Sequence, residues 1–135
     1  MSISRYVIIS DLHVSAGVLD DCDPEIEGHL CRFLEGLHSG TELVINGDFL
    51  DFAQAPPETG SDLESQTSTN TPLCFTEDQS TAKLKAIITA HPAVFKGLGA
   101  FLARSSDNRL TILPGNHDPD FFWDRVQKDF REALG

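Results

Sequence analysis

Three short clusters of polar residues carry the groups in this sequence that could do chemistry. They are Asp11-Leu12-His13, Gly47-Asp48-Phe49-Leu50-Asp51 and Gly115-Asn116-His117-Asp118. Carboxylate, imidazole and amide side chains are ligands for divalent metals. Two carboxylates about 4 Å apart repel each other by roughly 4 kcal/mol at an effective dielectric constant near 20, and a bound cation would relieve that repulsion. The three clusters therefore predict a metal site, if the fold brings them together.

The elements that must position these clusters are the apolar runs directly before them. We expect β-strands over residues 6–10, 42–45 and 109–113. The first run lacks polar alternation, which favours a strand covered on both faces, as in parallel sheets. Ligands bind beyond the carboxyl ends of the strands in open α/β sheets. Three clusters at three such ends should therefore lie close together.

Helical signals separate the predicted strands. Asp23 as N-cap and Pro24 as first helical residue predict a helix that completes a right-handed βαβ unit with the first two strands. The spacing of Thr76 and Gln79 is that of a capping box before a second helix. Pro92 interrupts that helix, which leaves either two helices or one kinked helix up to about residue 104. A last helix is expected to begin at Asp118-Pro119, with three apolar side chains stacked at four-residue intervals, namely Phe122, Val126 and Phe130.

Length and composition favour one globular domain over residues 1–135. A polar insertion at about 53–80, rich in Ser, Thr and Pro, is interpreted as a flexible surface loop, with a substrate lid as the alternative. The net charge of -11, from 10 Lys and Arg against 21 Asp and Glu, argues against a nucleic-acid partner. The sequence shows no signal peptide and no transmembrane segment, so we expect a cytoplasmic protein.

Each cluster taken singly has an ordinary explanation. Asp11 and Asp118 could cap backbone amides, His13 could be a loop histidine, and Gly115-Asn116 could form a turn. Their occurrence in order, each after a predicted strand, favours one joint site. The ordered set resembles the signature of the calcineurin-like metallophosphoesterase family, D-x-H, G-D-x-x-D and G-N-H-[DE], and all three blocks are present unaltered between residues 11 and 118.

The resemblance implies a site for two divalent metals. Asp11 and His13 would be ligands of the first metal, Asp48 would bridge both metals, and Asn116 would bind the second. Manganese is the first expectation, with iron, zinc or nickel as alternatives. A hydroxide held between the metals would attack a small phosphorylated substrate, a phosphate monoester, diester or pyrophosphate. His117, oriented by Asp51, would be the catalytic histidine near the leaving-group oxygen.

The sequence departs from the family in one large respect. It lacks two further histidine blocks, one single and one Gly-His-x-His, that complete the metal ligands in the family. His29, His38 and His91 are interpreted as surface or core histidines and not as replacements. The family fold is a four-layer α/β/β/α sandwich, of which this chain would supply the N-terminal half. We therefore expect a truncated domain with an uncovered apolar sheet face, through which the chain self-associates or aggregates.

Two other functions fit parts of the pattern. The chain could be a catalytically silent binding or scaffold module with the same fold, because the missing histidines favour silence while the intact blocks favour an active enzyme. It could also be a phosphoacceptor domain of the response-regulator type, which has acids at strand ends. That type predicts paired acids after the first strand and a lysine at a strand end, and neither is found here.

Overall fold

The chain folds as an α/β domain around one parallel sheet. The computed structural model describes residues 2–16, 24–55 and 76–135. Within these, strands β1 (Arg5–Ile9), β2 (Thr41–Asn46) and β3 (Arg109–Leu113) form a three-stranded sheet in the order β1-β2-β3, with both pairings parallel. The α-helices are α1 (Pro24–Glu35), α2 (Glu77–Ala90), α3 (Pro92–Ala103) and α4 (Asp124–Leu134). The 3-10 helix η2 (Pro119–Phe122) lies between β3 and α4. The predicted α/β class is confirmed, whereas the second sheet of a four-layer sandwich stays a prediction.

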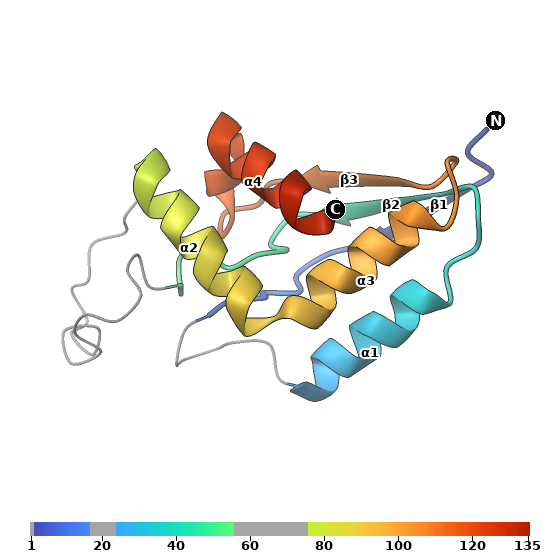
Figure 1. The fold of residues 1–135 in the computed structure, drawn as a ribbon, viewed down its shortest axis with the longest axis horizontal. Helices are drawn as coiled ribbons and strands as arrows, with labels where there is room; N and C mark the ends of the chain where they lie inside the picture. The colour runs from blue at the N-terminus through green and yellow to red at the C-terminus, as the bar shows by residue number, and fades with distance from the viewer. Residues whose placement is uncertain (1, 17–23, 56–75) are drawn as a thin grey trace.

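The strands run side by side and point the same way, so the loops that follow them lie together at one end of the sheet (Figure 1). The register places Val7, Leu43 and Leu110 in one row across the strands, and Ile9, Ile45 and Ile112 in another. All six side chains belong to the hydrophobic core or pack against it.

On the opposite face of the sheet, the two edge strands expose apolar side chains. Tyr6 and Ile8 of β1 are each 66% exposed, and Leu113 of β3 is 46% exposed. The prediction that the first strand is covered on both faces is therefore wrong for the described residues, while the expected uncovered apolar face is present. An unbroken apolar run cannot distinguish a covered strand from one with an open apolar face. Self-association through this face stays a prediction.

A cluster of phenylalanines under the strand ends supports the polar loops. Phe49 and Phe52, which directly follow the site residues Asp48 and Asp51, are almost completely buried. Phe49 packs edge-to-face on Phe130 of α4, and Phe52 does so on Phe121 of η2. Phe121 and Phe130 also meet edge-to-face with ring centroids 5.3 Å apart. Burial of such side chains contributes about 1.5–3 kcal/mol each, so the loop is held by the core beneath it.

The predicted helices are found, with one correction near the C-terminus. The capping box of Thr76 and Gln79 is present, and the chain forms two helices around His91, bent by 89°. The last helix does not begin at Asp118-Pro119, because η2 comes first and extended backbone at Trp123 separates it from α4. This break changes the helical phase, so Phe122 is 74% exposed instead of stacking with Val126 and Phe130, and Phe121 is buried in its place.

Two predictions fall on residues outside those described. They are the N-cap at Asp23 and most of the polar insertion, residues 56–75. Among the described helices, none by itself has the length and apolar character needed to cross a membrane, although the bent pair α2 and α3 passes that test jointly by length and composition.

Candidate metal centre

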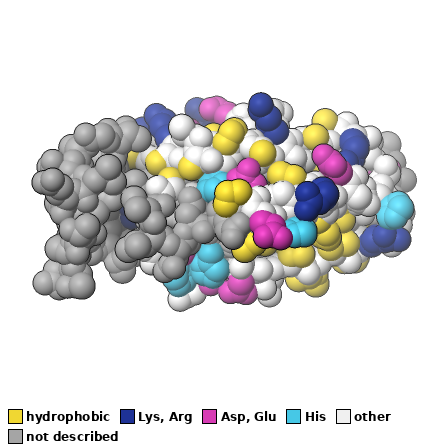
Figure 2. Space-filling view, turned by 90° about the horizontal axis from the view of Figure 1, so that it is seen from below, with side chains coloured by type: hydrophobic (Ala, Val, Ile, Leu, Met, Phe, Trp, Pro, Cys, Tyr) yellow, Lys and Arg dark blue, Asp and Glu magenta, His cyan; other side chains and the backbone are white. Residues whose placement is uncertain are grey.

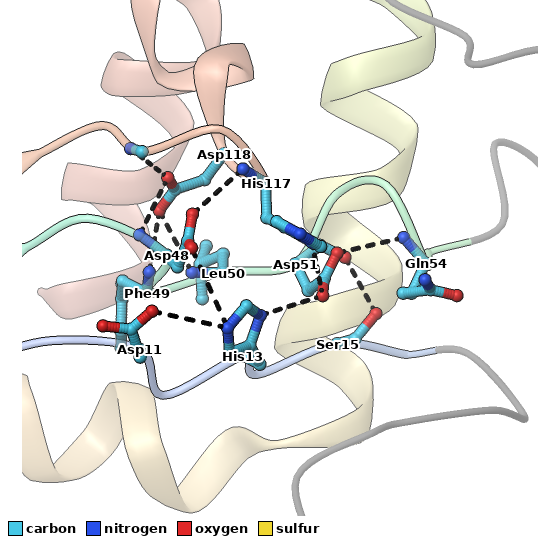
Figure 3. A network of polar contacts seen from close by, with 11 residues as sticks. Asp11, His13, Ser15, Asp48, Phe49, Leu50, Asp51, Gln54, His117 and Asp118 are labelled. Atoms are coloured by element: carbon cyan, nitrogen blue, oxygen red, sulfur yellow. Dashed lines mark hydrogen bonds and ion pairs between the residues drawn. The ribbon is translucent and has the colours of Figure 1, made fainter.

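Main-chain hydrogen bonds join the three polar loops to one another at the carboxyl end of the sheet. Figure 3 shows the polar side chains that these loops bring together. The N–H of His13 donates to the carbonyl of Asp48 at 3.0 Å, and the N–H of Asp51 donates to the carbonyl of Val14 at 2.8 Å. The third loop is joined in the same way, because the Phe52 N–H donates to the His117 carbonyl at 3.1 Å. Side chains on these loops are therefore held on a rigid base.

Three of the predicted ligands have unusual backbone conformations. Asp11, His13 and Asp48 have φ angles of 56°, 49° and 53°, and they are the only non-glycine residues with positive φ in the part of the chain that the structure describes. Asp and His tolerate this left-handed region better than most residues do. Such conformations persist only where the surroundings impose them, and they cluster at functional sites. Here all three residues lie on the loops whose side chains meet at one point.

Two carboxylates and one imidazole meet at that point. Nε2 of His13 lies 3.8 Å from Oδ1 of Asp11 and 3.8 Å from Oδ2 of Asp48. The Asp48 side chain is 13% exposed and that of His13 34%, whereas Asp11 is 67% exposed at the rim. The ligand atoms of these three residues all lie within 4.8 Å of one another, a spacing that one cation can span.

The amide of Asn116 also lies against the carboxylate of Asp48. One terminal amide atom lies 3.3 Å from Oδ1 and 3.1 Å from Oδ2 of Asp48. When that atom is the nitrogen, the amide donates to both carboxylate oxygens. When it is the oxygen, three acceptors meet, and a cation would link them. The residues present thus fit a divalent metal with mixed oxygen and nitrogen ligands, which suits the transition metals named above better than calcium.

The predicted pair of His117 and Asp51 is also formed. Nδ1 of His117 lies 3.0 Å from Oδ2 of Asp51, whose side chain is only 4% exposed. The hydrogen bond to this carboxylate raises the pKa of His117 above the 6.5 of an unperturbed histidine, and the charges of Asp48 and Asp118 add to that rise. Partial burial opposes the shift without cancelling it. His117 is thereby favoured as an imidazolium that can donate a proton from Nε2.

We expect the chemical shift of the His117 Cε1 proton to change with pH in the metal-free protein, with a midpoint above pH 6.5. Because the pKa is higher in the folded state, the pair stabilises the fold below the unfolded pKa, and this contribution is lost as pH rises through the folded pKa. The free energy of unfolding should therefore differ more between the native chain and His117→Gln at about pH 6 than at about pH 9. NMR titration and urea unfolding with a chelator present measure both quantities. A midpoint at or below 6.5 contradicts the prediction.

Two residues outside the predicted ligands and the catalytic pair, Gly115 and Asp118, also shape the site. A Cβ on Gly115 would lie 2.4 Å from Oδ1 and 2.8 Å from the backbone nitrogen of Asp48, so only glycine permits this approach. The buried carboxylate of Asp118 accepts backbone N–H groups from both the second and the third cluster. Asp118 therefore acts as the backbone cap that was its ordinary explanation, but it does so across 70 residues of sequence. No signal in one sequence reveals contacts at that separation.

The remaining histidines lie outside the cluster. His29 is 65% exposed on α1 beside Glu25, and the carbonyl of His38 accepts the Thr41 hydroxyl in the turn before β2. His91 is buried at the bend between α2 and α3, where its Nδ1 contacts Glu27. On the face shown in Figure 2, basic side chains are interspersed with acidic, histidine and hydrophobic ones among the coloured residues.

Comparison of the chain with protein-family models, with curated proteins and with solved structures finds no match. The six predicted site residues are nevertheless brought together by the fold. They are Asp11, His13, Asp48, Asp51, Asn116 and His117. Their function has to be argued from the geometry and chemistry of this cluster.

Proposed function

We propose that this chain binds divalent metal ions and hydrolyses phosphate esters, in the manner of the metallophosphoesterases that its motifs resemble. One observation carries the proposal. His13 Nε2 lies 3.8 Å from a carboxylate oxygen of Asp11 and 3.8 Å from one of Asp48. The ring of a second histidine, His117, lies beside that of His13, but its Nδ1 is hydrogen-bonded to Asp51. The first group is suited to metal binding, and the second is suited to proton transfer.

The chain's own residues would have two separate roles, metal binding and proton donation. Asp11, His13, Asp48 and Asn116 would hold the metal, which, when bound, neutralises phosphoryl oxygens and lowers the pKa of water. His117 would donate a proton to the leaving-group oxygen, because its Nδ1 is committed to Asp51 and only Nε2 remains to face a substrate.

A silent metal-binding module is the second candidate, and the composition of the site favours it. Among the ligands proposed here, only His13 supplies a nitrogen, and Asp11 is two-thirds exposed. Both features would weaken the hold on a metal. Binding without turnover would be the result if the site forms but cannot stabilise a transition state.

Metal titration combined with hydrolysis assays tests the proposal. We expect calorimetry to show saturable Mn²⁺ binding, and we expect p-nitrophenyl phosphate or its diester to be hydrolysed only with Mn²⁺ present. A chelator should abolish both. Asp107→Asn is the matched control, because this acid lies in the turn before β3, at the amino end of the strands. Binding without hydrolysis would support the silent module, and absence of binding by the folded protein would contradict both functions.

A further inference from the structure

A single oxygen atom of Asp51 contacts both histidines of the site. Its Oδ2 lies 3.1 Å from Nδ1 of His13 and 3.0 Å from Nδ1 of His117, and the two rings meet edge-to-face with centroids 4.9 Å apart. Its Oδ1 accepts the backbone N–H of Gln54 at 3.2 Å. The carboxylate is 4% exposed, so water competes little for these contacts. An ionised carboxylate only accepts hydrogen bonds, and each ring must therefore present an Nδ1–H to it.

This contact decides which nitrogen of His13 is free. A neutral imidazole carries one proton, and the hydrogen bond made by one nitrogen determines the state of the other. With its proton on Nδ1, His13 keeps a lone pair on Nε2, the atom that faces Asp11 and Asp48. A metal ligand needs that lone pair. Without an acceptor at Nδ1, the ring would be free to carry its proton on Nε2 and block the site.

We propose that Asp51 is a positioning residue for the metal centre, which sets the tautomer of the ligand His13 in addition to orienting His117. The inference rests on the proposed function in one respect, since it takes His13 as a metal ligand. A carboxylate behind a metal-binding histidine fixes the ring and makes it a better ligand, and loss of such a partner typically costs about 10- to 100-fold in metal affinity. One buried acid thus supports both the metal-binding and the proton-donating histidine.

The arrangement has one competing explanation. The ligand atoms of His13, Asp51 and His117 also lie within 4.8 Å of one another, so a metal could bind to this group directly. The two explanations differ in what they require of His117. Direct ligation by the second group needs His117 for metal binding, whereas positioning of His13 by Asp51 does not.

Tautomers in the metal-free protein are the first test. Long-range ¹H–¹⁵N NMR at alkaline pH distinguishes Nδ1–H from Nε2–H, and His13→Gln and His117→Gln assign the signals. We expect both rings to be Nδ1–H in the native chain. In Asp51→Leu, which fills the space without an acceptor, His13 should shift toward Nε2–H. Asn108→Ala is the control, because it removes a buried side chain with three hydrogen bonds at the other end of the sheet and should leave the tautomers unchanged.

Mn²⁺ titration of the same variants is the second test. We expect the affinity to fall about 10- to 100-fold in Asp51→Leu, less in Asp51→Asn, which retains one acceptor, and little in Asn108→Ala or His117→Gln. Loss of binding in His117→Gln would assign the metal to the competing group and overturn the inference, as would native affinity in Asp51→Leu. If the native chain binds no Mn²⁺, the proposed function fails, and the tautomers alone decide whether Asp51 positions His13.

Discussion

Replacement of Asp48 by asparagine is expected to lower the Mn²⁺ affinity more than about 100-fold and to reduce hydrolysis to the level of the metal-free protein. Loss of a partner that merely orients a ligand costs about 10- to 100-fold, so loss of a ligand at the centre of the site should cost more. Asp48 occupies that centre. Its Oδ2 lies 3.8 Å from Nε2 of His13, and the Asn116 amide lies against both of its oxygens.

The substitution removes the negative charge of Asp48 but keeps nearly the same side-chain shape. Asparagine keeps a side-chain oxygen that can accept the main-chain N–H of His117. In the native chain this N–H donates to Oδ1 of Asp48 at 3.0 Å. The loop should therefore stay folded while the negative charge is lost. Calorimetric titration and the phosphate ester assay measure the effect, with Asp107→Asn as the control for removal of one charge at a distance from the site. Native Mn²⁺ affinity in Asp48→Asn would show that the metal binds elsewhere.

The sequence was sufficient to predict the elements that deliver the site. The apolar runs before the three clusters form parallel strands with ends within one residue of those expected, because shortness and β-branched residues favour a strand over a helix. The helix starts at Pro24, Glu77 and Pro92 follow from proline and capping rules that act over a few residues. Local signals therefore predict local structure well here.

Features that depend on long-range packing were not predictable in this way. The exposure of Tyr6 and Ile8 depends on which elements cover the sheet, and no property of β1 itself decides that. The exposure of Phe122 depends on the break at Trp123, which contains neither proline nor glycine. The expected stacking of Phe122 with α4 was wrong for this reason.

The candidate site was predictable in its membership but not in its construction. Residue types and order place His13 and Asp51 in one site, yet only the fold shows that they hydrogen-bond to each other. The positive φ angles of Asp11, His13 and Asp48 are equally invisible in sequence, because none of them is glycine. Each is imposed by main-chain hydrogen bonds between loops that lie far apart in the chain.

Removal of the Asp118 carboxylate is expected to destabilise the whole domain. This side chain is fully buried and accepts four backbone N–H groups. Gly115 and Asp48 donate to Oδ1 at 2.6 and 3.2 Å, and Phe49 and Leu50 donate to Oδ2 at 2.8 and 3.3 Å. Each buried N–H left without an acceptor costs about 1–3 kcal/mol. We therefore expect Asp118→Ala to lower the free energy of unfolding by roughly 3–5 kcal/mol.

Urea unfolding monitored by circular dichroism, with a chelator present, measures this loss in the absence of any bound metal. Asp118→Asn should be less damaging, because it keeps one acceptor, but its amide would meet N–H groups where the second oxygen stood. Asp78→Ala is the matched control at the surface. Its side chain is 86% exposed in an ion pair with Arg125, and such pairs contribute about 0–1 kcal/mol. Equal stability of Asp118→Ala and Asp78→Ala would contradict the prediction.

The two carboxylates, Asp118 and Asp48, should then separate stability from metal binding. Asp118 ties the turn that carries Asp48 to the loop that carries Asn116, so it positions ligands from two clusters without facing the metal. In Asp118→Asn, the metal affinity should fall together with the free energy of unfolding. In Asp48→Asn, the affinity should fall while stability in chelator changes little. The opposite pattern would show that Asp118, and not Asp48, lies at the metal.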